Sequence, residues 1–187
     1  LGELTENPEF DHPQPHEQGF DYSLGTENNA EPSHRNPINF IRNGKALGEV
    51  KGYSCQIVAK ECMDWLNQNS DNPFFLYVAF HEPHTKVASP LDLVEKYANQ
   101  PLKDARYLAN IEHVDRAIGR ILDYLNQHDL MDNTIIMFSS DNGSYRLASN
   151  AGLKAVKSYL YDGGIRVPGI VKWPGIQTNR KVIDTPT

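Results

Sequence analysis

The sequence has little positive charge and no long apolar stretch, and both shortages exclude classes of function. Its 18 Lys and Arg are outnumbered by 24 Asp and Glu, which gives a formal net charge of -6. Because nucleic-acid binders neutralise phosphates with clustered Lys and Arg, this balance argues against a nucleic-acid partner. No apolar run approaches the roughly 20 residues of a membrane span. The composition, 39% hydrophobic in 187 residues, fits one globular domain with a core.

Cysteine is scarce too. Cys55 and Cys62 are the two cysteines, seven residues apart in one predicted helix. At a helical rise of 1.5 Å per residue their Cα atoms would be ~10 Å apart, which excludes a disulfide between them. Both would lie on one apolar face, so we expect buried core thiols; a metal or redox role is the less favoured alternative.

Residues 1–50 are predicted to be a long loop region, because five of the twelve prolines lie there and apolar periodicity is weak. Loops of this length inside a compact domain are usually functional. Within it, the polar cluster 33–37 contains His34 and Arg35, side chains suited to anionic sugars. We therefore predict that both bind substrate, the alternative being a structural loop with solvated charges.

Residues 51–187 show an α/β pattern. Helical spacing of apolar residues predicts helices over 54–69, with Ser54 as the N-cap, and over 104–129. Apolar runs at 74–80 and 134–138 predict strands buried on both faces, and a third run lies at 167–173. Strands alternating with helices are typical of a largely parallel sheet flanked by helices.

Polar residues follow the first two predicted strands, where ligands bind in such sheets. Asp141 and Asn142 follow the second strand and offer hard oxygen ligands suited to Ca²⁺ or Mg²⁺, although an ordinary Asn-Gly turn is an alternative. Because such a cation takes six to eight oxygens, other ligands would have to come from elsewhere.

The first strand is followed by His81 and His84, which could move protons or hold an anion, and Lys154 and Lys157 could hold an anionic substrate. For each, a solvated surface side chain is the plainer reading. Together at one sheet edge they suggest hydrolysis or transfer at an anionic ester.

Five motifs occur in order: FFLYVAFHEPH at 74–84, NIEHVDRAIG at 110–119, FSSDNG at 138–143, YDGGIRVP at 161–168 with Lys157 before it, and WPG at 173–175. This series resembles the type I sulfatases of the alkaline phosphatase superfamily along essentially the whole chain. The resemblance implies an alkaline-phosphatase-like α/β fold with a mixed, largely parallel sheet. It also implies a Ca²⁺ held by three Asp and one Asn, and a formylglycine nucleophile made within a Cys/Ser-x-Pro-x-Arg sequence.

Residue by residue, the resemblance assigns part of a site to this chain. Asp141 and Asn142 match half of the metal site, and His84 matches the histidine that contacts the sulfate and assists the leaving oxygen. Lys157 matches the sulfate-binding lysine, and His81 lies beside His84 as a substrate-binding candidate.

The Cys/Ser-x-Pro-x-Arg sequence is absent: Cys55 is followed by Gln-Ile-Val and Cys62 by Met-Asp-Trp. Around Lys157, Lys154-Ala155-Val156 stands where the family more often has Arg-Gly-Gly. We therefore expect residues 1–187 to be a partial catalytic domain that lacks an N-terminal segment carrying the nucleophile and the remaining Ca²⁺ ligands, and to be inactive alone.

The resemblance to N-acetylgalactosamine-sulfate hydrolases implies sulfated sugars as substrates and a periplasmic, secreted or lysosomal protein. Two alternatives stay open: a phosphatase or phosphodiesterase of the same superfamily, and a non-catalytic relative that binds sulfated glycans.

Overall fold

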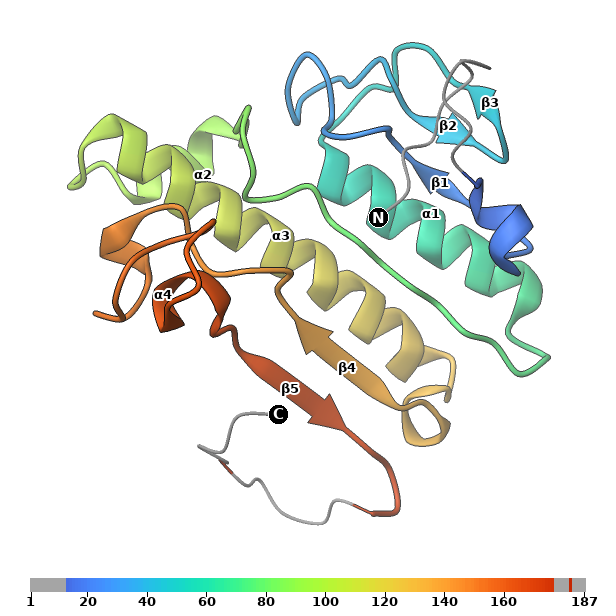
Figure 1. Cartoon of the computed structure of the whole chain (residues 1–187). Coiled ribbons are helices and arrows are strands. Elements are labelled where there is room, and N and C mark those ends of the chain that lie inside the picture. The colour runs from blue at the N-terminus through green and yellow to red at the C-terminus, as the bar shows by residue number, and fades with distance from the viewer. Residues whose placement is uncertain (1–12, 177–181, 183–187) are drawn as a thin grey trace. The chain divides into compact units, whose positions relative to one another are not determined.

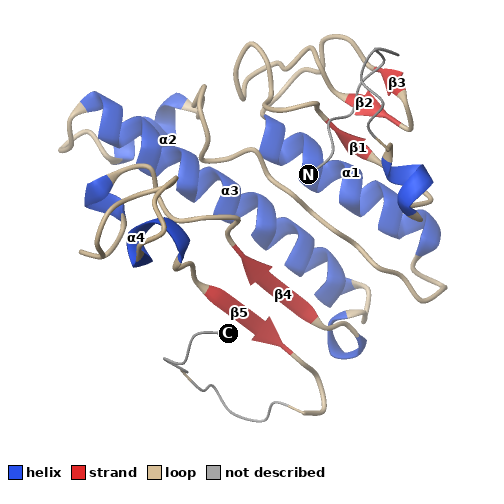
Figure 2. Ribbon diagram, in the orientation of Figure 1, coloured by secondary structure: helices blue, strands red, loops and turns tan. Residues whose placement is uncertain are grey.

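A computed structural model describes residues 13–176 and Val182, which belong to two units, Leu1–Leu125 and Asn126–Thr187 (Figure 1). The predicted loop residues 1–12 lie outside the described residues. Helices and strands both contribute, as the α/β prediction requires (Figure 2). In the described part of the chain, no helix has the length and apolar character needed to cross a membrane.

The described part of the predicted loop region, 13–50, is loop except for short elements. A 3-10 helix covers Pro15–Gln18, and three two-residue strands follow: β1 (Leu24–Gly25), β2 (Ile41–Arg42) and β3 (Lys45–Ala46). They pair antiparallel in the order β1-β2-β3. The guanidinium of Arg42 binds the carboxylate of Glu61 through both oxygens, which ties β2 to the following helix.

Three helices complete the first unit: α1 (Ser54–Asn69), α2 (Leu91–Lys96) and α3 (Leu102–Gln127). The two long helices were predicted to within two residues at each end, because their periodicity is a local property of the sequence. They share a core of small and branched side chains: Cys55, Ala59, Ala117 and Ile121. Alanine and cysteine at this contact let the two helices approach closely.

Both cysteines are free thiols, Cys55 fully buried and Cys62 half-buried, as predicted. Burial disfavours the thiolate, so it raises the pKa of Cys62 to about 12 and also raises the pKa of Cys55.

The prediction that Ser54 is the N-cap of α1 is wrong. Tyr53 holds the N-cap position in an extended conformation and makes no side-chain cap hydrogen bond. Ser54 is the first helical residue, and its hydroxyl donates instead to the carboxylate of Glu82. Serine is a common N-cap residue, but here the Ser54 hydroxyl is hydrogen-bonded to Glu82, 28 positions further along the chain.

The predicted buried strand at 74–80 is also wrong. The segment is extended but pairs with no strand in the described part of the chain. Its side chains alternate: Val78 and Phe80 pack on the core of α1 and α3, while Phe75 and Tyr77 are 76% and 59% exposed. One face is buried by the helices between which it runs in Figure 1, and nothing described covers the other face.

The second unit contains two short 3-10 helices, Met131–Asn133 and Leu147–Ser149, the short helix α4 (Asp162–Ile165), and the strands β4 (Ile136–Ser139) and β5 (Gly169–Lys172). The strands pair antiparallel, with Ile136 opposite Lys172 and Ser139 opposite Gly169. β4 overlaps the predicted run 134–138 and extends one residue past it, and β5 lies inside the predicted run 167–173.

The strand predicted at 134–138 is not buried on both faces, since Met137 in β4 is 77% exposed, and Ile170 in β5 is 61% exposed. Every strand pair in the described ranges is antiparallel.

Candidate functional site

The predicted metal ligands lie on the loop that leaves β4. Asp141 is exposed and Asn142 is half-buried, and the Asn142 amide donates to an Asp141 carboxylate oxygen. The Ser140 hydroxyl donates to the Asn142 backbone carbonyl at 3.0 Å, which steadies the loop. An exposed carboxylate beside an amide carbonyl is an all-oxygen donor pair, so these residues fit a hard cation such as Ca²⁺.

Two ligands do not complete a shell of six to eight oxygens. Within the described ranges, no three His, Cys, Asp or Glu side chains gather in an arrangement that could hold a metal ion. A cation at Asp141 and Asn142 would therefore need further ligands from outside these residues.

Backbone hydrogen bonds join this loop to the segment that carries Lys157. The Gly143 amide donates to the Gly164 carbonyl at 2.9 Å, and the Lys157 amide donates to the Ser144 carbonyl at 3.0 Å. Lys157 is thus fixed beside the Asp141–Asn142 loop within one unit.

Glycine makes this packing possible. A Cβ atom added to Gly143 would lie 2.1 Å from the Gly163 carbonyl oxygen, and one added to Gly163 would lie 2.1 Å from the Ala155 carbonyl oxygen. Real Cβ atoms do not approach backbone that closely, so only glycine permits the contact. The sequence shows these glycines close to the candidate site residues, but only the structure shows that close backbone packing requires glycine at these positions.

The two candidate lysines differ in their surroundings. Lys154 is exposed, and its ammonium lies 3.9 Å from the centre of the Tyr161 ring, a cation–π contact. Lys157 is half-buried. The buried Asn150 holds the segment that precedes Lys157: its side-chain amide donates to the carbonyls of Leu153, at 2.9 Å, and Ala155. The two lysines therefore differ: the backbone of Lys157 is hydrogen-bonded to the loop that carries Asp141 and Asn142, whereas the Lys154 ammonium is in contact with the Tyr161 ring.

In the first unit, the His81–His84 turn follows the extended segment 74–80, and the His84 amide closes it by donating to the His81 carbonyl at 2.9 Å. The imidazole of His84 is exposed, with Nδ1 3.0 Å from the Thr85 carbonyl oxygen. A carbonyl only accepts, so Nδ1 carries a proton, and Nε2 is the atom available to a ligand.

His81 is more enclosed than His84. Its Nε2 lies 2.8 Å from the Thr26 hydroxyl, and its ring meets Phe40 edge-to-face at 5.6 Å between centroids. Burial lowers the pKa of His81, so this imidazole stays neutral at neutral pH. These contacts anchor the turn to the loop region before α1.

His34 and Arg35 occupy opposite environments. His34 is 0% exposed, its ring 3.3 Å from the Asn110 amide nitrogen and 3.7 Å from a Glu82 oxygen. An imidazole buried among protein groups does not face a ligand in solvent, so the prediction that His34 contacts substrate directly is corrected. Arg35 is exposed on the same loop and stays a candidate.

Sequence reasoning missed a buried polar cluster beneath the His81–His84 turn. Its members are the fully or nearly fully buried side chains Ser54, Glu82, Asn110 and His113, with His34. The one available signal was Asn110 and His113 on the apolar face of a predicted helix, where polar residues are rare.

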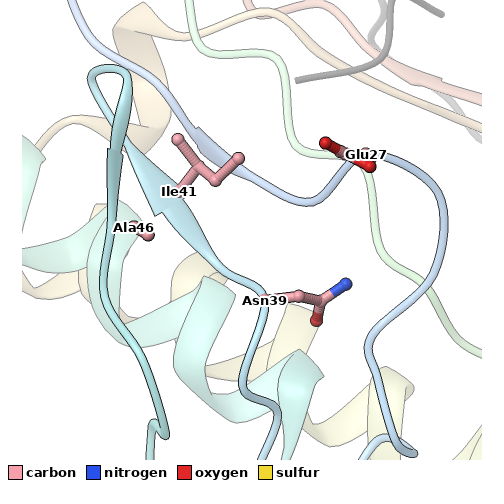
Figure 3. Close-up of a pocket in the computed structure, with 4 residues that line it drawn as sticks. All are labelled: Glu27, Asn39, Ile41 and Ala46. Carbon is pink, nitrogen blue, oxygen red and sulfur yellow. The ribbon is translucent and has the colours of Figure 1, made fainter. Parts of the chain in front are cut away.

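A pocket lies apart from these residues, beside β2 and β3 (Figure 3). Glu27, Asn39, Ile41 and Ala46 line it, and none of the predicted site residues is among them. Asn39 is engaged in loop structure there, since its side chain accepts from the Glu31 amide and donates to the Asn29 carbonyl.

Comparison with known proteins identifies the class of this chain. Residues 3–187 match the family model described as Sulfatase. The chain therefore belongs to the sulfatase family. Its fold is the alkaline-phosphatase-like α/β fold of sulfatases, of which the described residues form part.

Individual sulfatases are similar along most of the chain. The uncharacterized sulfatase YdeN of Escherichia coli is 33% identical over 169 residues, which cover 87% of this chain and 30% of YdeN. Human N-acetylgalactosamine-6-sulfatase is 31% identical over 68% of this chain and 25% of its own length. Among solved structures, Ps i-CgsB in complex with k-i-k-neocarrahexaose has a TM-score of 0.75 and 28% identity, covering 91% of this chain and 42% of that one. The chain thus spans less than half the length of these relatives.

Proposed function

We propose that the full-length protein is a sulfatase that hydrolyses sulfate esters, with sulfated sugars as its substrates. The observation that carries the proposal is the fixing of Lys157 beside the Asp141–Asn142 loop, through the Lys157 amide and the Ser144 carbonyl. A positively charged side chain for the sulfate and two oxygen ligands for a metal then lie on segments joined by backbone hydrogen bonds, in a chain of the sulfatase family.

Lys157 would bind the sulfate group. Its ammonium would lie beside the sulfuryl oxygens, on which negative charge grows as the ester is attacked. Because its backbone is held in place, the ammonium needs little reorganisation at the moment of reaction, which is how positioned charges accelerate such steps.

His84 would contact the same sulfate and assist the leaving oxygen. With Nδ1 donating to the Thr85 carbonyl, Nε2 is free of that bond and, when protonated, donates to an anionic oxygen or to the departing alkoxide. We propose that His84, like Lys157, contacts the sulfate of the substrate. The support is that both match sulfate-contacting positions of the family.

Asp141 and Asn142 would hold a Ca²⁺ ion through side-chain oxygens, together with ligands from outside this chain. Such an ion would supply positive charge next to the sulfate oxygens. The nucleophile, a formylglycine in our proposal, would also come from outside, because the sequence has no Cys/Ser-x-Pro-x-Arg.

Two relatives support a sugar substrate: one is an N-acetylgalactosamine-6-sulfatase, and the other was solved in complex with k-i-k-neocarrahexaose. Arg35 would contribute to sugar choice; it is exposed, and the His34 amide beside it donates to the Lys86 carbonyl just after the His81–His84 turn. We extend the family-based expectation of a periplasmic, secreted or lysosomal location to this protein.

The test compares turnover of 4-nitrophenyl sulfate and 4-nitrophenyl phosphate by the full-length protein, before and after calcium removal with a chelator. We expect sulfate to be the preferred ester and chelation to abolish turnover. Preference for phosphate would favour a phosphatase instead, and binding of sulfated glycans without turnover would favour a non-catalytic relative.

Two lysine variants sharpen this test. Lys157→Ala should lower kcat/KM for the sulfate ester by about 10²–10³-fold, the usual effect of removing one charge-stabilising group. Lys154→Ala is the matched control: its ammonium is engaged with Tyr161, so turnover should stay within about twofold of wild type. Equal losses from both variants would contradict the assignment of Lys157.

A further inference from the structure

A conspicuous buried charge outside the site residues is Glu82, in the middle of the His81–His84 turn. Glu82 is 8% exposed, and its carboxylate accepts from the Ser54 hydroxyl and from the Cys55 backbone amide, the latter at 3.0 Å. An ionised carboxylate loses much hydration when buried, so it persists only where donors or positive charge replace the water. Both donors here come from the first turn of α1.

The N-terminus of α1 lacks a cap from its own sequence. Tyr53 makes no side-chain cap bond, although the first amide groups of any helix have no partner inside the helix. Other segments satisfy them: the Ser54 amide donates to the His34 carbonyl at 2.8 Å, and the Cys55 amide donates to Glu82. Glu82 is distant in sequence but accepts a hydrogen bond at the N-terminus of α1, as an N-cap side chain would. At this end of the helix the helix dipole also favours a carboxylate.

Further hydrogen bonds connect the His81–His84 turn, the loop at His34 and the helices α1 and α3. The His34 amide donates to the Lys86 carbonyl at 3.2 Å, just after His84, while the His34 carbonyl holds the Ser54 amide. Asn110 of α3 lies 3.3 Å from the His34 ring and donates to the Ala88 carbonyl at 3.2 Å. Figure 1 shows the geometry: the extended segment runs back along α1 and brings the turn to the N-terminal end of that helix.

We infer that Glu82 is a positioning residue: by capping α1 from the His81–His84 turn, it holds His84 in place for the reaction. This rests on the proposed sulfatase function and on the role of His84 in it. Glu82 itself touches no substrate, because its carboxylate is buried under the turn. His84, two residues further on, is exposed.

The test uses three variants of the full-length protein, assayed with aryl sulfates well below their unfolding temperatures. Glu82→Gln keeps an oxygen that accepts from Ser54 and Cys55 but loses the charge, whereas Glu82→Ala loses both. Because a shift of about 1 Å at a reacting group can cost 10²-fold, we expect kcat/KM to fall about 10²-fold in Glu82→Ala and about 10-fold in Glu82→Gln. Glu49→Gln, an exposed glutamate before α1, is the control and should leave activity unchanged.

A double variant separates positioning from general damage to the fold. If Glu82 acts through His84, Glu82→Gln should cost little further activity once His84 is alanine, because coupled residues are non-additive. Fully additive losses in the double variant, or wild-type activity in Glu82→Ala, would overturn the inference.

A second readout does not depend on activity. Glu82→Ala should lower the unfolding temperature more than Glu82→Gln does, because only the alanine leaves the Cys55 amide without an acceptor. If the wild-type protein hydrolyses no sulfate ester, the proposed function fails while this cap can still be checked. Equal unfolding temperatures for wild type and Glu82→Ala would refute the cap.

Discussion

Replacing Gly143 by alanine tests the packing that joins the Asp141–Asn142 loop to the segment carrying Lys157. The new Cβ atom would lie 2.1 Å from the Gly163 carbonyl oxygen, 2.8 Å from its carbon and 3.0 Å from the Gly164 carbon. All three are backbone atoms, so no side chain can swing away to relieve the clash. The two segments must separate, and the bond from the Gly143 amide to the Gly164 carbonyl, 2.9 Å long, must lengthen or break.

The magnitude follows from these two losses. Overpacking costs about 1–3 kcal/mol, and a lost backbone hydrogen bond about 0.5–1.5 kcal/mol, so we expect the free energy of unfolding to fall by about 2–4 kcal/mol. A separation of about 1 Å between Lys157 and the Asp141–Asn142 loop should also lower kcat/KM about 10²-fold.

The assay is denaturant unfolding of the full-length protein together with aryl sulfate turnover. Gly169→Ala in β5 is the control, since a Cβ there would meet nothing within 4 Å, and its stability should change by less than about 0.5 kcal/mol. If Gly143→Ala matched Gly169→Ala in stability and in turnover, the close packing of the two loops would not hold Lys157 in place, and the reasoning would be refuted.

Two further predictions concern the first unit. Burial lowers the pKa of His34, His81 and His113 from 6.5, against the opposing effect of the Glu82 carboxylate. Below about pH 6.5 the unfolded chain therefore binds more protons than the folded chain does. The free energy of unfolding should decrease there by up to about 1.4 kcal/mol per pH unit for each imidazole. A free energy of unfolding that is equal at about pH 7.5 and about pH 5.5 would contradict this prediction. Arg35→Ala should change kcat/KM unequally across a panel of sulfated sugars, and an equal effect on all of them, or none, would count against a selective role.

The sequence predicted the helices well and the strands poorly, for a physical reason. The apolar spacing in α1 and α3 is set by residues three and four apart, which lie close together whatever the rest of the chain does. A strand depends on its neighbours: the run at 74–80 has strand composition, yet no described segment pairs with it. Its exposed residues, Phe75 and Tyr77, show that burial on two faces cannot be read from composition alone.

Sequence motifs named candidate site residues, but they could not show which residues distant in sequence come into contact. Asp141, Asn142 and Lys157 were named from motif order, and their loops are joined in the structure. His34 was predicted to bind substrate because it lies in a polar loop, but its buried ring contacts Asn110 and Glu82, which are 76 and 48 positions further along the chain. No local pattern shows that Glu82, rather than Ser54, caps α1.

The most direct test of the account is a crystal structure of the full-length protein with a sulfated sugar bound. We predict one sulfate group with His84 Nε2 and Lys157 Nζ both within about 3 Å of its oxygens. A sulfate held without either side chain, or His84 and Lys157 bound to separate anions, would contradict the sulfate-binding roles proposed for these two residues.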